Sequence, residues 1–221
     1  MKIKAIVFDF DGTLVDSAPG LMAAANIVLE EWGYPGITVD DAKVFIGDGM
    51  AVFSDRAVAK GGGTLGEANR DRFVNRFRQT YAEVDAEQTV LYPGAMDTLQ
   101  RFAADGVAMG LCTNKPHGAT LPILSAVGID GYLSAVFGGD SLDGVRKPDP
   151  RHVLAVLDAL GVAPADAVMV GDSPNDVKAG KGAGLPVIAV TYGYSLGPVE
   201  ALGADVLIDN LIDLPAVLEN L

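Results

Sequence analysis

Cysteine and long apolar runs are scarce in this chain of 221 residues. The single cysteine, Cys112, excludes an intramolecular disulfide, which fits a reducing compartment and predicts a cytoplasmic protein. No apolar run reaches the roughly 18 residues that a membrane span needs. The first residues, Met1 to Lys4, run straight into an apolar segment, which predicts that no signal peptide is present.

Positive charge is also scarce, because 16 Lys and Arg stand against 29 Asp and Glu and give a formal net charge of −13. That balance argues against non-specific binding to nucleic acid or to an anionic membrane, since both need a basic patch. An anionic substrate would therefore need locally concentrated positive charge or a metal ion. Hydrophobic residues make up 49% of the chain, enough for one α/β core, alone or with a small second domain.

Short apolar segments alternate with helical patterns over most of the chain. The expected helices are 94–104, 118–127, 150–160 and 175–183, and the expected strands are 3–8, 107–113, 135–138, 167–171, 186–191 and, more weakly, 205–208. This alternation predicts an α/β fold, a Rossmann-like parallel sheet covered by helices on both faces. Ligands of such sheets bind beyond the carboxyl ends of the strands.

Residues 17–89 break the alternation and show helical patterns only, at about 19–32, 40–60 and 66–84. Phe73, Phe77 and Tyr81 recur every four residues, as on the buried side of an amphipathic helix. Four arginines on that helix suggest either an anion site or, as we favour, a solvated charged face (Arg70, Arg72, Arg76 and Arg78). We expect two domains, a core of 1–16 and 90–221 and an inserted helical domain of 17–89.

The segment Asp9-Phe10-Asp11-Gly12-Thr13 directly follows the first expected strand. In extended backbone, residues two apart point to the same side, so both carboxylates reach one space if the strand geometry persists. Two acids so close repel unless a cation lies between them or one keeps a proton. A surface turn and a calcium-binding loop are the alternatives for this segment alone.

Polar residues follow three further strands. Thr113 and Asn114 come after the second strand, where they could hold phosphate oxygens or simply cap a helix. Lys147 comes after the third strand, between a loop and prolines, and by itself could be a solvated surface charge. Asp172 and Asp176 come after the fourth strand, where capping of the next helix is the alternative to metal binding.

Together these residues indicate a functional site more strongly than each does alone, because the carboxyl ends of parallel strands lie at one edge of a sheet. Asp9, Asp11, Asp172 and Asp176 together would repel, but a divalent cation and Lys147 supply three positive charges, and a proton kept on Asp11 supplies the rest. Hard oxygen ligands favour Mg²⁺, which is usually completed by water and substrate phosphate. The sequence therefore predicts a Mg²⁺ site and a phosphorylated substrate.

The chain resembles the haloacid dehalogenase superfamily, in particular its aspartate-nucleophile phosphatases and, among these, the bacterial phosphoglycolate phosphatases. The resemblance covers nearly the whole chain and rests on the motifs above, together with Ile46-Gly47-Asp48-Gly49, Tyr92-Pro93-Gly94, Gly138-Gly139-Asp140-Ser141-Leu142 and Thr191-Tyr192-Gly193-Tyr194. It implies a parallel-sheet core with a small all-helical cap inserted after the first strand. It also implies a small phosphorylated metabolite as substrate, 2-phosphoglycolate first of all.

The resemblance implies specific roles. Asp9 would be the nucleophile that forms an aspartyl-phosphate, and Asp11 the acid and then the base. Mg²⁺ would be bound by the Asp9 carboxylate, the Asp11 backbone carbonyl and Asp172, with Asp176 acting through water or by orienting its neighbours. The expected phosphate and substrate contacts are Gly12, Thr13, Thr113, Asn114 and Lys147 in the core, and Gly47, Asp48 and Gly49 in the cap.

Gly47-Asp48-Gly49 departs from the family pattern, in which relatives commonly carry Ile-Gly-Asn-Gly at this place. A carboxylate at Asp48 would repel the carboxylate of phosphoglycolate unless it points away or is paired. The segment is either a cap loop that meets the substrate or a simple tight turn between glycines. No catalytic role is expected for His117 and His152, which we assign to helix surfaces or caps, or for Cys112, which should pack inside the second strand.

Alternative functions remain open at this point. Another phosphometabolite (a sugar phosphate, a nucleotide or pyrophosphate) could be the substrate, and a phosphomutase could use the same aspartate. Dehalogenation without metal is disfavoured by Asp11 and Asp172, and a module that binds without turnover is disfavoured by the intact set of acids and Lys147. We expect no nucleic-acid or membrane partner, and either a monomer or a homodimer.

Overall fold

The computed structural model describes residues 3–195 and 197–221, except for the side chains of residues 85–87. Met1 and Lys2, which the sequence places before the first strand, lie outside the described residues. The chain divides into two compact units. The first is made of two segments, the chain up to Val15 and Leu91–Leu221, and the second comprises Asp16–Val90. The expected domain limits differ from this division by one residue at each crossing. At the crossings lie two short paired strands, β2 (Val15–Asp16) and β3 (Val90–Leu91).

The first unit is built on a six-stranded sheet with the order β5-β4-β1-β6-β7-β8. All of its strand pairs are parallel. The predicted parallel sheet is thereby confirmed. Its strands are β1 (Ala5–Phe8), β4 (Ala108–Cys112), β5 (Ala135–Phe137), β6 (Ala167–Gly171), β7 (Val187–Val190) and β8 (Val206–Ile208).

Most strands are one or two residues shorter than expected, because apolar character continues past the last ladder hydrogen bond. At Pro186, for example, the chain has no N–H to donate to a ladder. The sheet is covered on both faces, as the alternation of side chains along each strand requires. Ile6 and Phe8 of β1 pack with helices on one face, and Ala5 and Val7 pack with helices on the other.

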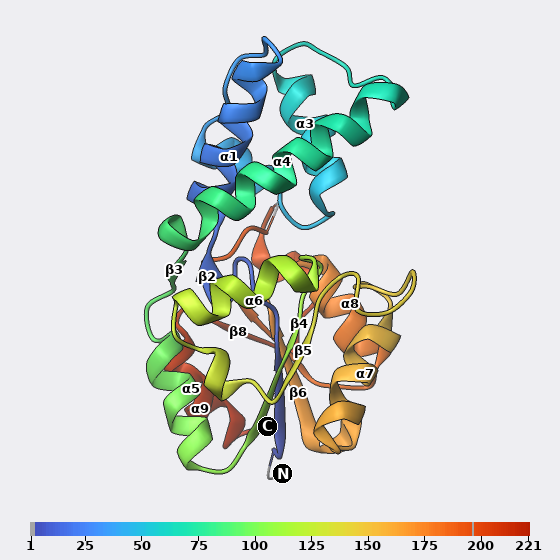
Figure 1. Cartoon of the computed structure of the whole chain (residues 1–221). Helices are drawn as coiled ribbons and strands as arrows, with labels where there is room; N and C mark the ends of the chain where they lie inside the picture. Colours follow the sequence, from blue (N-terminus) through green and yellow to red (C-terminus); the bar gives the residue numbers. More distant parts are fainter. Residues whose placement is uncertain (1–2, 196) are drawn as a thin grey trace. The chain divides into compact units, whose positions relative to one another are not determined.

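The first face carries α5 (Ala95–Ala104), α6 (His117–Ala126) and α9 (Leu214–Leu218), and the second carries α7 (Pro150–Leu160) and α8 (Pro174–Gly182). Figure 1 shows α5 and α9 on one side of the strands and α7 and α8 on the other. With both faces buried, the polar residues after the strands are left at the sheet's carboxyl-terminal edge.

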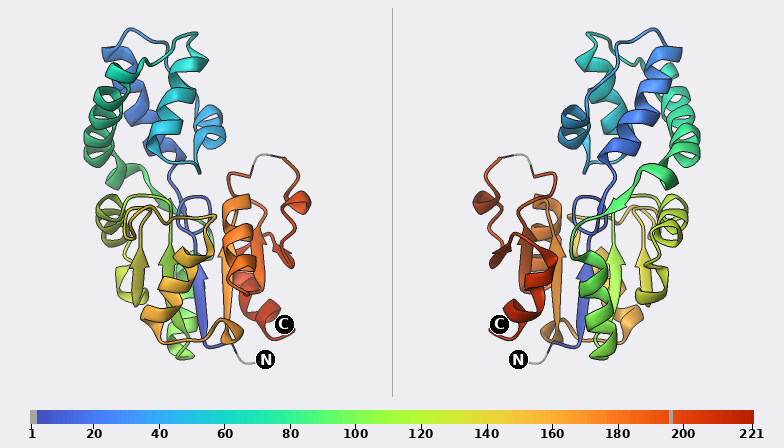
Figure 2. Two further views of the ribbon diagram at one scale, coloured as in Figure 1. Left: turned by 90° about the vertical axis from the view of Figure 1, so that its right-hand side faces the viewer. Right: turned by 90° about the vertical axis from the view of Figure 1, so that its left-hand side faces the viewer.

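The second unit contains the helices α1 (Ala18–Glu31), α2 (Val39–Phe45), α3 (Met50–Lys60) and α4 (Glu67–Gln88). Figure 2 shows them, coloured from blue to green, packed against one another. The buried stripe Phe73, Phe77 and Tyr81 is confirmed, with exposed fractions of at most 3%. Arg70 pairs with Asp55 and Arg76 with Glu31 on the exposed side of α4, so these arginines form a charged surface as we favoured.

The single helix predicted over 40–60 is wrong, because the chain forms two helices there. Residues 46–49 leave the helix, and Gly47 and Gly49 adopt φ values of +115° and +91°, which residues with a Cβ rarely adopt. Thr38 caps α2 in a reciprocal capping box with Asp41. Among the described residues of both units, no helix combines the length and apolar character needed to cross a membrane.

Candidate active site

The polar residues expected at the site follow strands of the core sheet. Asp9 comes directly after β1, and its N–H donates to the carbonyl of Val170 on β6 at 2.9 Å. Thr113 follows β4, Asp172 follows β6, and Lys147 lies between β5 and α7. Because the strands are parallel, these segments leave the sheet at the same edge.

Lys147 lies between two carboxylates. Its Nζ is 2.6 Å from Asp9 Oδ1 and 2.6 Å from Asp176 Oδ1, and its side chain is only 2% exposed. Burial alone would lower the pKa of this ammonium, but the charges of Asp176 and Asp9 outweigh burial and raise it above its ordinary value. Lys147 therefore stays charged and is a fixed cation beside Asp9, not the solvated surface lysine of the alternative interpretation.

The carboxylates of this edge carry more negative charge than Lys147 neutralises. Asp9, Asp172 and Asp176 are buried, and each offers an oxygen within 4.8 Å of the others. Burial and the neighbouring Asp176 raise the pKa of Asp9 well above its usual range, and they raise the pKa of Asp172 to about 7. A further cation would relieve this repulsion, and the oxygen donors fit a hard divalent ion such as Mg²⁺.

Asp176 also has a structural role. Its Oδ2 accepts hydrogen bonds from the N–H groups of Asp172 (3.1 Å) and Ser173 (2.9 Å) and from Ser173 Oγ (2.7 Å). Ser173 and Asp176 form the capping box of α8, as the capping alternative proposed. Gly171 lets the carboxylate approach, because a Cβ there would lie 2.4 Å from Asp176 Cγ. Asp176 thus holds both Lys147 and the backbone of Asp172 in place.

Asp172 is fixed by residues distant in the sequence. Its Oδ2 accepts from the N–H of Tyr194 at 2.6 Å, and its Oδ1 accepts from Thr13 Oγ1 at 3.3 Å. Gly12 and Gly193 flank it closely, since an added Cβ would lie 2.3 Å from Asp172 Oδ2 or 2.2 Å from Asp172 Cβ. Sequence reasoning assigned no role to Gly193 and Tyr194, although a glycine between tyrosines just after a strand was a usable signal.

Gly12→Ala should destabilise the protein by about 2–4 kcal/mol, from left-handed backbone strain and overpacking against Asp172. Gly12 has φ +86°. Gly106→Ala is the matched control, since Gly106 has φ +71° but nothing within 4 Å of an added Cβ, and it should cost only about 1–2 kcal/mol. Urea unfolding of both variants measures the difference, and equal losses would show that the contact with Asp172 has no energetic effect.

Thr113 and Asn114 organise the loops of the site. Thr113 Oγ1 accepts from the N–H of Lys115 at 3.1 Å, and Asn114 Nδ2 donates to the carbonyl of Lys147 at 2.9 Å. Asn114 thereby ties the loop after β4 to the loop that carries Lys147. Thr13 and Gly12 lie against Asp172. Direct contact of Gly12, Thr13, Thr113 and Asn114 with a phosphoryl group stays a prediction for each.

Asp11 does not belong to the three-carboxylate group. The strand ends at Phe8, and hydrogen bonds from Leu14 N–H to the Phe10 carbonyl and from Gly12 N–H to the Val15 carbonyl turn the chain, so strand alternation does not extend to Asp11. Its Oδ1 lies 2.8 Å from Nζ of Lys115, a residue absent from the predicted site. Metal binding through the Asp11 carbonyl stays a prediction.

Gly47, Asp48 and Gly49 lie in the helical unit. The carboxylate of Asp48 is paired, with Oδ2 2.6 Å from Arg56 Nη2, which meets one of the conditions under which its charge would not repel an anionic substrate. The positive φ values of both glycines fit a tight turn leading into α3. A substrate contact by these three residues stays a prediction.

His152 differs from its predicted place on a helix surface or cap. It is fully buried in α7, and its Nε2 lies 3.1 Å from the carbonyl of Gly138. Burial lowers its pKa to about 4, so the ring is neutral at pH 7 and donates to that carbonyl. Cys112 is buried in β4 as expected, and burial raises its thiol pKa to about 12.

Comparison with known proteins agrees with this fold. Residues 3–184 match the family of haloacid dehalogenase-like hydrolases, and the chain belongs to that family. It is 41% identical over 217 residues to a phosphoglycolate phosphatase of Rhodospirillum rubrum, covering 96% of this chain and 89% of that protein. It is 38% identical over 210 residues to that of Caulobacter vibrioides, covering 95% and 88%.

Solved structures show the same relationship. The crystal structure of a predicted phosphoglycolate phosphatase from Haemophilus somnus superposes with a TM-score of 0.92 at 34% identity, covering 98% of each chain. Core sheet and helical insertion are therefore shared over almost the whole length.

Proposed function

We propose that this chain is a Mg²⁺-dependent phosphatase that hydrolyses 2-phosphoglycolate to glycolate and phosphate. The observation that carries the proposal is the buried Asp9, held 2.6 Å from the Lys147 ammonium and close to Asp172 and Asp176. A carboxylate buried beside a fixed cation suits attack on a phosphoryl group, whose oxygens need positive charge around them. The named phosphatases to which the chain is similar support the choice of substrate.

In this mechanism, an Asp9 oxygen attacks phosphorus while the bond from phosphorus to the ester oxygen breaks. In its protonated form Asp11 gives the proton to the leaving oxygen, and as the resulting carboxylate it later takes one from the water that hydrolyses the aspartyl-phosphate. Lys147, Thr113 and Asn114 hold the phosphoryl oxygens. Asp9, Asp172 and the Asp11 carbonyl would hold Mg²⁺, with Asp176 orienting them, and the ion when bound supplies positive charge beside the phosphoryl group.

Three features of the proposal come from the sequence and the family resemblance alone. Residues 17–89 would serve as a cap domain that sets specificity, through Gly47, Asp48 and Gly49. A cytoplasmic location and a monomeric or homodimeric state likewise stay predictions.

Metal removal tests the proposal directly. Phosphate release from 2-phosphoglycolate should fall by about 100-fold or more after dialysis against a chelator, because several kcal/mol of charge stabilisation is lost. Added Mg²⁺ should restore it. Full activity after prolonged chelation would contradict the metal assignment.

A substrate panel measured in the same assay tests the substrate. 2-Phosphoglycolate should have a higher kcat/KM than sugar phosphates, nucleotides and pyrophosphate. Faster hydrolysis of one of these would reassign the substrate, and interconversion of sugar phosphates that depends on a bisphosphate would indicate a phosphomutase.

A further inference from the structure

Lys115 is a buried cation beside the proposed acid, and the proposed chemistry does not use it. Its side chain is 5% exposed, and its Nζ lies 2.8 Å from Asp11 Oδ1. The ammonium also lies 5.7 Å from the centre of the Phe10 ring, within the range of a cation–π contact. Lysine is rarely buried, and positive charge is scarce in this chain, whose net charge is −13. A lysine buried at the carboxyl-terminal edge of the sheet is therefore unusual.

The backbone of Lys115 is held on both sides. Its N–H donates to Thr113 Oγ1 at 3.1 Å, and its carbonyl accepts from Gly139 N–H at 2.8 Å. Gly138 and Gly139 permit this approach, since an added Cβ would lie 2.8 Å from the Lys115 carbonyl oxygen or 2.4 Å from that of Asn114. The lysine therefore starts from a fixed point, and its ammonium has a defined place next to Asp11.

Stability alone is a weak reason for this pair. A buried ion pair often contributes little net stability, because desolvation offsets the attraction of the charges. Lys147 already lies against Asp9 and Asp176, so Lys115 places a separate positive charge at Asp11. That position matters for the substrate, because Asp11 is the group that meets the leaving oxygen in the proposed function.

The leaving alcohol of 2-phosphoglycolate carries a carboxylate, separated from the leaving oxygen by a single carbon atom. When that oxygen is within hydrogen-bonding distance of Asp11, the substrate carboxylate lies close to the Asp11 carboxyl group. Without a cation there, burying this negative charge at an edge that already holds Asp9, Asp172 and Asp176 is unfavourable. The Lys115 ammonium, 2.8 Å from Asp11 Oδ1, is placed to supply it.

We propose that Lys115 binds the carboxylate of the leaving alcohol and so makes the enzyme selective for phosphate esters of small 2-hydroxy acids over neutral esters of the same size. This inference rests on the proposed phosphatase function and names the residue that recognises the substrate class. This selectivity comes from Lys115, a residue of the core unit. Any contribution of the helical unit to specificity would be additional.

The test compares 2-phosphoglycolate with ethyl phosphate, which has a methyl group in place of the carboxylate. In Lys115→Met with Mg²⁺ present, kcat/KM for 2-phosphoglycolate should fall about 10- to 100-fold, mostly through KM, as expected for loss of a charge-assisted contact. The ratio of kcat/KM between the two esters should fall by nearly the same factor. Lys115→Arg keeps the charge and should retain most of the ratio.

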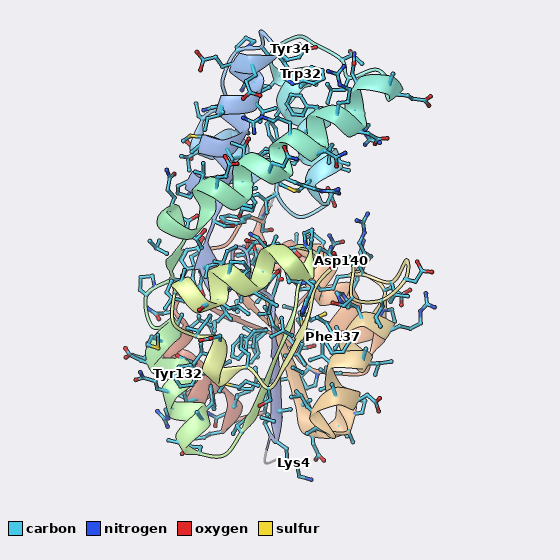
Figure 3. All side chains as sticks on the ribbon, viewed as in Figure 1. Lys4, Trp32, Tyr34, Tyr132, Phe137 and Asp140 are labelled. Carbon is cyan, nitrogen blue, oxygen red and sulfur yellow. The ribbon has the colours of Figure 1, made fainter. Side chains whose placement is uncertain are left out.

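Lys4→Met is the matched control. Lys4 pairs with Asp166 at 2.9 Å, and its side chain is 64% exposed. Figure 3 shows Lys4 at the opposite end of the core unit from Asp140, whose Oδ1 accepts from the N–H of His117, near Lys115. This control removes the same charge far from the edge and should leave the ratio unchanged. Lys115→Gln, which can still donate to Asp11, replaces Lys115→Met if that variant fails to fold.

The following outcomes overturn the inference. Equal losses on both esters leave the ratio unchanged and would show that Lys115 acts only by positioning Asp11, with no role in selectivity. A wild-type enzyme that hydrolyses ethyl phosphate as well as 2-phosphoglycolate would remove the selectivity while leaving the phosphatase function standing. If the wild type released phosphate from neither ester, the proposed function itself would fail, and this inference with it.

Discussion

Asp9→Asn is expected to lower kcat for phosphate release by about 10,000-fold or more, the scale of loss when an enzyme's nucleophile is removed. An amide cannot take the place of a carboxylate as the nucleophile that attacks phosphorus, and Asp9 places such a carboxylate 2.6 Å from the Lys147 ammonium. The protein should stay folded. Burial and Asp176 disfavour the charged form of Asp9 and raise its pKa, so removing that charge relieves repulsion with Asp176 and Asp172.

The measurement is steady-state phosphate release with Mg²⁺, together with urea unfolding of the same preparations. Asp166→Asn is a suitable control, because it removes a carboxylate that pairs with the exposed Lys4 at the other end of the sheet. It should turn over at the wild-type rate. A folded Asp9→Asn protein with wild-type turnover would rule out Asp9 as the nucleophile.

Lys147→Met should lower the free energy of unfolding by about 3–5 kcal/mol, as is typical when one partner of a buried ion pair is removed. The ammonium lies 2.6 Å from both Asp9 and Asp176, so its loss leaves two buried carboxylates without their cation. Methionine keeps most of the volume of the side chain, so the loss of stability measures the effect of removing the charge and not a change in packing. Urea unfolding in chelator measures the change.

Two further variants separate the causes. Lys4→Met removes an exposed partner of a surface pair and should change stability by less than about 1 kcal/mol. Adding Asp176→Asn to Lys147→Met should recover part of the loss, because one of the stranded carboxylates is removed. If Lys147→Met unfolds at the wild-type urea concentration, Lys147 does not offset the charges of Asp9 and Asp176.

Residues far apart in the sequence account for most of what sequence reasoning missed. Lys115 meets Asp11 across 104 positions, and Thr13 meets Asp172 across 159. Neither pair leaves a periodic signal, because periodicity reports only which side of a helix or strand a residue occupies. His152 was misplaced for the same reason, since an imidazole in a helical pattern looks alike on either side until the packing partner, the Gly138 carbonyl, is known.

The break of the helix predicted over 40–60 had a local signal that was underused. Gly47 and Gly49 take positive φ values, and glycine is the residue that tolerates them. The tight turn named as one alternative for Gly47-Asp48-Gly49 is incompatible with one continuous helix over 40–60.

The apolar segments and their order along the chain were enough to establish a parallel sheet with helices on both faces, because a strand buried on both faces must be apolar throughout and a parallel connection must cross over. The same topology brings Asp9, Thr113, Lys147 and Asp172 to one edge, since parallel strands all end there. Folding then settled which charges touch: Lys147 between Asp9 and Asp176, and Lys115 at Asp11. Such pairing depends on the paths of the loops and on distances of a few ångströms. The order of residue types along the chain determines neither in a way that sequence patterns reveal.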